Sequence, residues 1–593
     1  MIKTIDMKNF IKLIIIIITC SLKAIGQDVN LDSMLDKQMD AKNQDKIQRT
    51  EATFKSTRLI NGHTVETTQG GVLDVRISHR FGQLDDGFYN LFGLDFASIR
   101  IGMDYGLTNR LMVGGGRSSF EKQFDGFLKY RLLWQSTGKR VMPVSLTLLS
   151  TAFYKTLKPS SDSIKINNSD KWYFGLQALV ARKFNSSFSM QLMPTMIHYN
   201  LAVEGAPNNL YSIGVGARMK LTKHTALTAE YYYQLPNYKI PGTYNSFSLG
   251  YEIETGGHVF QLHLSNSTGM VERPFITETN GRWSKGDIHI GFNISRVFTV
   301  HRPKSISQNI TPAERWSIRA DTISNIKSDS TTQYAIATFK TDHLINGHSV
   351  ETTQKGVLDV KIQHRFGTLN QGFYNWFGLD QATERIGFDY GLTNRLEIGG
   401  GRSSFEKEYD AFLKYRLLWQ SNGEKKMPVS VTLLAAMSVK TLKETVDSIK
   451  IQTSDRFYYV YQAMIARKFG KAFSFQVSPT LIHYNIVPTS ETPNDLISIG
   501  FGARLQLTPR SSLLAEYFYQ LPDRRLPGSY NSFSIGYEIE TGGHVFHFHF
   551  TNSTGMTERT FINETTGQWK DGDIHFGFNI ARVFTVAKPK TVQ

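Results

Sequence analysis

Charged and histidine side chains recur at every second position in several segments of this 593-residue sequence. In residues 286–295, Asp287 and His289 alternate with apolar residues, and Glu252 and Glu254 do so around residue 250. Successive side chains of a β-strand point to opposite faces, so these segments would gather their polar groups on one surface of a sheet. The chemistry open to such a surface is ion pairing, selection of a solute by charge, or metal binding.

If the apolar faces meet lipid, the polar faces line the lumen of a barrel. The expected lumen-lining residues of the first half of the chain are Arg100, Asp104, Asp125, Lys129, Arg131, Glu230, Glu252, Glu254, His263, Asp287 and His289. Those of the second half are Arg385, Asp389, Asp410, Lys414, Arg416, Glu516, Glu538, Glu540, His549, Asp573 and His575. Cross-strand ion pairs worth about 0.2–1 kcal/mol each are one expectation for them. A charged constriction that selects small polar solutes is the other.

A metal site is not expected among these residues. His547 and His549 share one face of a strand, but the first half has Gln261 and His263 at the matching positions. No third ligand can be placed from the sequence.

Enzymatic motifs are equally scarce. The run GGGRSSF at Gly114 lacks the ending of a phosphate-binding loop, and neither HExxH nor GxSxG occurs. Cys20 is the only cysteine, which leaves the rest of the chain without thiol chemistry or cysteine metal sites. We therefore expect no cofactor and no enzymatic activity. A hydrolase whose catalytic residues are distant in the sequence and come together only in the fold is a third alternative, after the two functions given at the end of this section. The net charge is +16, but basic and acidic residues alternate, so nucleic acid is not an expected partner.

The chain is a tandem duplication. ATFKSTRLINGHTVETT at Ala52 returns as ATFKTDHLINGHSVETT at Ala337, and the match continues through nearly the whole of each half. The expected organisation is a signal peptide at 1–26, a periplasmic segment at 27–51, a first barrel at 52–300, a periplasmic linker at 301–336, a second barrel at 337–586 and a tail at 587–593.

Alternation predicts about twelve strands in each copy, and the connections between them are unequal. Short connections such as 108–109 and 222–224 alternate with long ones such as 82–97 and 266–285. This asymmetry is typical of outer-membrane barrels, whose periplasmic turns are short and whose external loops are long. The sequence therefore predicts an all-β chain of two antiparallel transmembrane barrels, with one barrel of about twenty-four strands as the alternative.

Four short sequence motifs, each present in both halves, resemble those of a known family. HRFG at His79 and His364, DYGLTNRL at Asp104 and Asp389, GGGRSSFEK and EIETGGHVF are similar to a family of bacterial outer-membrane β-barrel proteins of unknown function. The resemblance implies a barrel in the cell outer membrane in contact with its lipid, and no established substrate.

From the charged lumen face we expect a channel or transport-related protein for small polar solutes. The alternative is a plugged structural or ligand-binding barrel that presents external loops such as 82–97, 266–285 and 552–571.

Overall fold

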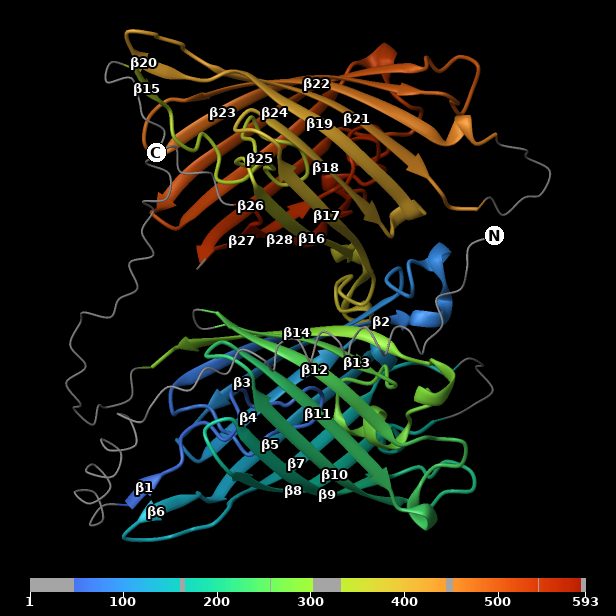
Figure 1. Cartoon of the computed structure of the whole chain (residues 1–593). Coiled ribbons are helices and arrows are strands. Elements are labelled where there is room, and N and C mark those ends of the chain that lie inside the picture. The colour runs from blue at the N-terminus through green and yellow to red at the C-terminus, as the bar shows by residue number, and fades with distance from the viewer. Residues whose placement is uncertain are drawn as a thin grey trace. The chain divides into compact units, whose positions relative to one another are not determined.

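The computed structural model describes residues 47–159, 166–255, 258–301, 332–443, 452–541 and 543–587, and Figure 1 shows their course. The predicted signal peptide at 1–26 lies outside the described residues, as do most of the segments 27–51, 301–336 and 587–593. In the described part of the chain, no helix is both long enough and apolar enough to cross a membrane.

Twelve antiparallel strands of the first half close into a barrel, called barrel 1. Each strand pairs with the next barrel strand along the chain, and β14 pairs with β2 to close the ring. The strands are β2 (Val72–Gln83), β3 (Ala97–Gly106), β4 (Leu111–Ser118), β5 (Gln123–Leu133), β7 (Ser145–Lys155), β8 (Trp172–Lys183), β9 (Phe188–Tyr199), β10 (Asn209–Lys220), β11 (Thr225–Gln234), β12 (Ser246–Thr255), β13 (His258–Ser265) and β14 (His289–Thr299).

The second half forms barrel 2 with the same topology, and β28 pairs with β16 to close it. Its strands are β16 (Val357–Thr368), β17 (Ala382–Gly391), β18 (Leu396–Ser403), β19 (Glu408–Leu418), β21 (Ser430–Lys440), β22 (Phe457–Lys468), β23 (Phe473–Tyr484), β24 (Asp495–Thr508), β25 (Ser511–Gln520), β26 (Ser532–Thr541), β27 (His544–Thr551) and β28 (His575–Thr585). The prediction of two tandem barrels of twelve strands is confirmed, and the single larger barrel is not formed.

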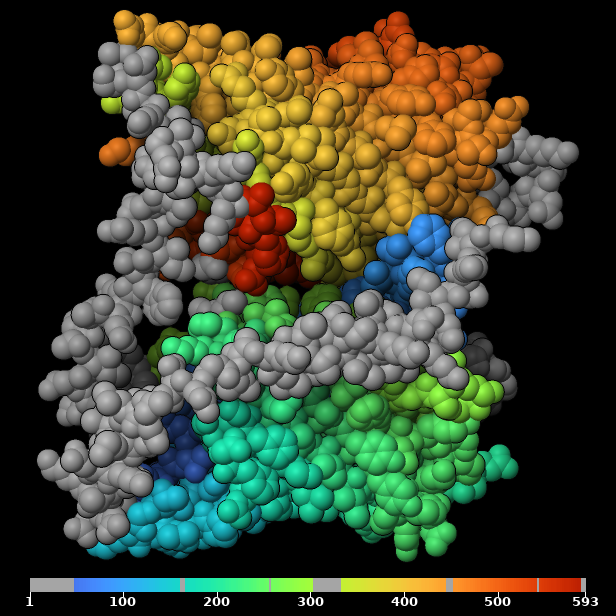
Figure 2. Space-filling model, viewed as in Figure 1, coloured from blue at the N-terminus to red at the C-terminus, as the bar shows by residue number. Residues whose placement is uncertain are grey.

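Alternation separates an apolar outer face from a polar inner face, as β5 illustrates. Leu128 and Tyr130 are 49% and 44% exposed, whereas Lys129 and Arg131, which alternate with them, are 0% and 2% exposed. The barrel thus inverts the ordinary soluble pattern, because its charges are inside and its large apolar side chains are outside. On the visible face of each barrel, side chains cover the strands as a continuous wall (Figure 2).

The two ends of each barrel differ. In barrel 1 the segments 107–110, 184–187 and 221–224 connect strands at one end, called the short-turn end, and the loops 84–96 and 266–288 lie at the other, called the long-loop end. One connection at the short-turn end is longer than the others. It runs from residue 134 to residue 144 and contains the short strand β6 (Ser136–Gly138).

Strand β6 pairs with β1 (Ile47–Arg49) in a separate two-stranded sheet. In the second half, β15 (Thr332–Tyr334) pairs with β20 (Ser421–Gly423) in the same register.

Candidate functional site: the filled lumen

The interior of each barrel contains a β-hairpin supplied by the segment that precedes its first barrel strand. We call residues 53–66 and 338–351 the lumen hairpins of barrels 1 and 2. In barrel 1, Arg58 and His63 form an antiparallel bridge, and Leu59 N–H donates to the carbonyl of Gly62 at 2.9 Å. Residues 53–65 are buried except Lys55.

A single wall carboxylate binds the tip of this hairpin. Glu230 of β11 accepts hydrogen bonds from the backbone N–H groups of Ile60, Asn61 and Gly62 at 3.4, 2.8 and 3.2 Å. Hydrogen bonds to a charged acceptor are stronger than neutral ones, so Glu230 is the main anchor of the tip. In barrel 2, Glu516 binds the corresponding N–H groups at 2.7–2.9 Å.

Other wall side chains satisfy the remaining polar groups of the hairpin backbone. Gln191 of β9 accepts from Val65 N–H at 2.6 Å and donates to the carbonyl of His63 at 2.8 Å. Further donors reach hairpin carbonyls from β5, β7, β13 and β14, namely Lys129, Arg131, Thr147, Gln261 and Asn293. The wall thus supplies the hydrogen bonds that a buried backbone requires.

Both ends of the lumen hairpin lie at the short-turn end of the barrel. Lys55 forms an ion pair of 2.7 Å with Glu254, which is next to the end of β12. On the other side, Thr67 Oγ1 donates to the carbonyl of Asn109 in the 107–110 turn at 3.1 Å. The hairpin therefore enters and leaves the lumen by the same opening.

The other half of the lumen is occupied from the long-loop end. Residues 266–281 and 552–567, called the inner loops, begin the connections before the last strand of each barrel. The sequence predicts external loops here, but the inner loops turn into the lumen because they carry apolar residues. Phe275 and Ile276 are 0% exposed, and the Phe275 ring lies 5.1 Å from the ring of Tyr232 in the wall, measured between centroids.

An arginine fixes each inner loop to the wall. In barrel 1, Arg273 donates to Gln123 at 2.8 Å and to Glu278 at 2.5 Å, and it also bonds Glu121. In barrel 2, Arg559 forms ion pairs with three carboxylates, those of Glu406, Glu408 and Glu564.

The lumen hairpin and the inner loop meet inside the barrel. Glu272 Oε1 lies 3.6 Å from Arg58 Nη1 and 3.6 Å from His63 Nε2. Burial lowers the pKa of His63 well below its ordinary value and raises that of Glu272. In barrel 2, Glu558 Oε1 lies 3.3 Å from His348 Nε2.

Barrel 2 differs from barrel 1 beside the hairpin. Asp342 and His343 replace Thr57 and Arg58, and Lys361 of β16 donates to Asp342 at 2.5 Å and contacts His343 Nδ1 at 3.0 Å. A cavity of about 20 Å³ beside this cluster is close to the size of one water molecule.

One set of residues in this cluster has metal-ligand geometry. Ligand atoms of Asp342, His343 and Asp389 lie within 4.8 Å of one another. The Lys361 ammonium forms hydrogen bonds to Asp342 and Asp389 and contacts His343, so it lies where a metal ion would bind.

The residues predicted to line the lumen fall into groups. Those bound to a lumen hairpin are Lys129, Arg131, Glu230, Lys414, Arg416 and Glu516, and Asp104 accepts from Thr57 at 3.2 Å. Ion pairs along the wall join Arg100 to Asp125, Arg385 to Asp410, Glu252 to Arg218 and Glu538 to Arg504. Asp389 bonds Lys361, and His263 and His549 are buried.

The remaining members lie near the barrel ends. Glu254 and Glu540 pair with Lys55 and Lys340, and His289 and His575 contact backbone carbonyls of Phe81 and Phe366 at 2.9 and 2.7 Å. Asp287 and Asp573 precede the last strands and accept from backbone N–H groups of Arg282 and Gln568.

Sequence reasoning missed the lumen hairpins themselves. Their residues were recognised only as the start of the repeat. One signal could have found them. Each hairpin segment mixes polar and apolar residues without strand alternation, occurs in both halves, and precedes strands with many inward charges.

Closed strand rings with apolar outer walls and filled polar interiors define this protein as a tandem membrane-bound β-barrel. The chain belongs to the family described as Membrane bound beta barrel domain (DUF5777), whose model matches residues 54–298 and 339–584. No curated protein matches the chain.

Solved structures with detectable similarity include the NanC porin, at 9% identity over 38% of this chain and 98% of that one, with a TM-score of 0.25. Acinetobacter baumannii Omp33 matches at 10% identity over 38% and 97%, with a TM-score of 0.23. OmpT of Vibrio cholerae matches at 9% identity over 69% and 98%, with a TM-score of 0.22. Scores this low carry no argument about the function of this chain.

Proposed function

We propose that each barrel is a gated passage for small polar solutes in the bacterial outer membrane, closed in its resting state by the lumen hairpin and the inner loop. Closed antiparallel barrels with an even strand number and unequal loops are the architecture of that membrane, which supports the location. The predicted signal peptide points to the same compartment. No catalytic step is part of the proposal.

The observation that carries the proposal is the polar attachment of the lumen hairpin. Its tip is bound by Glu230 and its carbonyls by wall amides, lysine and arginine. Water can replace each of these bonds, so the net cost of releasing one is about 1 kcal/mol, far below its strength in an apolar medium. Both ends of the hairpin lie at one opening, so it can withdraw without breaking the wall.

Single-channel recording in planar bilayers tests this proposal. The full chain should be silent or open rarely. Replacing residues 53–66 and 266–281 by short glycine-serine linkers should give barrel 1 a defined conductance step. The same change at 338–351 and 552–567 should add a second step of similar size.

Heat-modifiable migration on gels would establish that these variants still contain folded barrels. Folded variants that stay silent would refute the gated passage. A wild-type chain that conducts continuously would refute the closed resting state.

A second candidate is a closed barrel that binds a ligand at its long-loop end. It is favoured by a pocket on barrel 2 that is independent of the lumen.

A further inference from the structure

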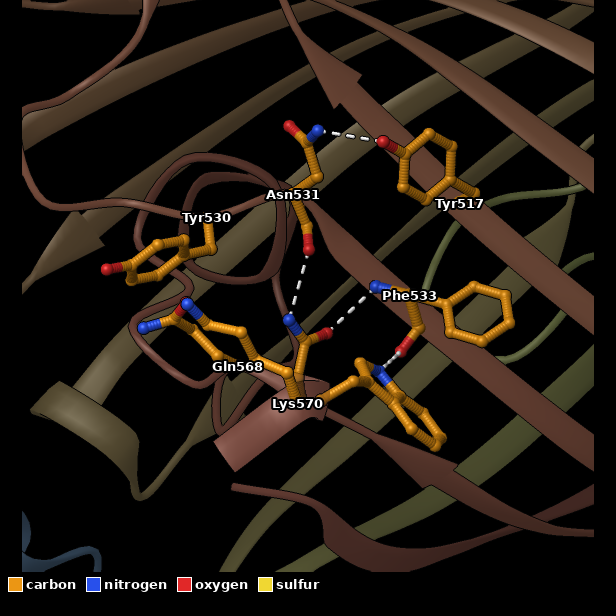
Figure 3. Close-up of a pocket in the computed structure, with 8 residues that line it drawn as sticks. Tyr517, Tyr530, Asn531, Phe533, Gln568 and Lys570 are labelled. Atoms are coloured by element: carbon orange, nitrogen blue, oxygen red, sulfur yellow. Dashed lines mark hydrogen bonds between the residues drawn. The ribbon is translucent and has the colours of Figure 1, made fainter. Parts of the chain in front are cut away.

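Barrel 2 has a pocket of about 440 Å³ beside its long-loop end (Figure 3). Three of its aromatic lining residues are Tyr517 of β25, Phe533 of β26 and Trp569, which begins the short helix η16 (Trp569–Asp571). Tyr517 and Phe533 belong to the outer face, because their strand neighbours Glu516 and Ser534 are buried inside. The pocket is therefore on the outer wall, at the level where aromatic girdles of membrane barrels meet lipid headgroups.

The floor of the pocket is fixed by hydrogen bonds. The Asn552 side chain accepts from Phe533 N–H at 2.8 Å and donates to the carbonyl of Asn531 at 3.0 Å. Asn531 donates to the Tyr517 hydroxyl at 2.8 Å, and Trp569 Nε1–H donates to the carbonyl of Phe533 at 3.0 Å. These bonds hold the aromatic rings in place before any ligand arrives, which lowers the entropic cost of binding.

Three polar groups at the pocket remain available to a ligand. Within the part of the chain that the structure describes, the side chains of Tyr530, Gln568 and Lys570 form no hydrogen bond or ion pair, and Lys570 is exposed. Aromatic faces pack against the C–H face of a sugar ring, while a phenol and an amide bind its hydroxyls. An ammonium supplies the countercharge for a phosphate.

We propose that this pocket binds a phosphorylated pyranose, presented as the headgroup of a glycolipid in the outer leaflet. The outward position of the pocket selects the lipid-borne form over a free sugar. The proposal does not depend on whether the lumen conducts.

Barrel 1 provides the matched control. Arg282 and Ser284 stand where barrel 2 has Gln568 and Lys570. The Arg282 guanidinium lies 5.3 Å from the centroid of the Tyr244 ring, which corresponds to Tyr530. In barrel 1 a guanidinium thus stands over this ring, at the place where the ligand would pack in barrel 2, and we expect one site per chain.

The experiment uses the full chain in detergent, with lipopolysaccharide as the probe and native mass spectrometry to count bound molecules. Wild type should bind one molecule per chain. The Q568R/K570S variant, which has the barrel 1 residues at these positions, should lose at least tenfold in affinity. The R282Q/S284K variant should bind a second molecule. Both pairs of substitutions use residues that the other copy accommodates, so folding should be preserved.

Isothermal titration with glucose 1-phosphate and glucose separates the parts of the proposal. Glucose 1-phosphate should compete with lipopolysaccharide and bind more tightly than glucose, and K570S should remove that difference. Binding of the free sugar without lipopolysaccharide binding would overturn the lipid source. Equal lipopolysaccharide binding by wild type and Q568R/K570S would overturn the site.

Discussion

Replacing Glu230 by Gln should release the tip of the lumen hairpin in barrel 1 while leaving the wall intact. The carboxylate accepts from three backbone N–H groups, at residues 60, 61 and 62. Glutamine has nearly the same shape but only one acceptor oxygen, and its amide nitrogen would face N–H donors. Weakening the charge-assisted bonds and leaving one buried donor unpaired should cost about 3 kcal/mol.

Hydrogen exchange followed by mass spectrometry measures this change directly. A cost of about 3 kcal/mol corresponds to roughly a hundredfold rise in the open fraction of the tip, and hence in the exchange of residues 60–62. Residues 345–347 of barrel 2, bound by the unchanged Glu516, should keep their protection in the same sample.

A matched control tests whether loss of any glutamate on this wall has the same effect. Glu254 pairs with Lys55 at the base of the hairpin, where the lysine side chain is 46% exposed, and with Arg218, which keeps Glu252 as a second partner. Exposed pairs of this kind contribute about 0–1 kcal/mol, so Glu254→Gln should change tip exchange less than about fivefold. Unchanged protection of residues 60–62 in Glu230→Gln would refute the assignment of Glu230 as the anchor.

Three further outcomes are expected. In Gly62→Val, a Cβ atom would lie 2.0 Å from the Tyr232 hydroxyl, so exchange at the hairpin tip should rise strongly. Burial raises the pKa of Glu558 from its ordinary 4.5 to about 7. The folded inner loop of barrel 2 therefore favours the neutral acid, and the loop loses about 3 kcal/mol of stability as pH rises from about 4.5 through 7. Proteolysis of that loop should therefore increase between pH 5 and pH 8 in wild type and stay flat in Glu558→Gln. Arg559→Leu leaves three carboxylates without their shared cation, which should cost about 3–5 kcal/mol and lower the melting temperature in detergent, whereas Lys570→Ser should not.

The wall of the barrels was predictable from the sequence because it follows from a local rule. Alternation at residues 286–295 separates the faces of a strand without knowledge of its neighbours, and β14 has the expected polar inner face. Asp287 marks the limit of that rule. It continues the alternation, but the strand begins only at His289, because Asp287 accepts from the backbone N–H of Arg282 in the loop.

The filling of the lumen could not be predicted in the same way. The contact between Asn61 and Glu230 joins residues 169 positions apart, and no periodic pattern connects them. The inner loops were expected to extend outward because long loops of outer-membrane barrels usually do. Phe275 and Ile276 were a signal against that expectation, since two large apolar residues in a loop need a place to be buried.

The two copies also indicate that each lumen hairpin is fitted to its own wall. In barrel 1, Arg76 donates to the Thr57 hydroxyl at 3.2 Å. In barrel 2 the hairpin carries Asp342 instead, and the facing wall residue is Lys361, whose ammonium binds the carboxylate.

At a second contact the threonine is the same in both copies and only the wall residue differs. The N–H of Thr68 lies 3.3 Å from the sulfur of Met112 in barrel 1, whereas the N–H of Thr353 donates to the Glu397 carboxylate at 2.5 Å in barrel 2. If the hairpin occupied the lumen only in passing, a buried charge on the hairpin would need no partner on the wall, because water would solvate it. The charged residues of barrel 2 instead meet partners inside the lumen. This favours the closed state as the state in which each barrel spends most of its time.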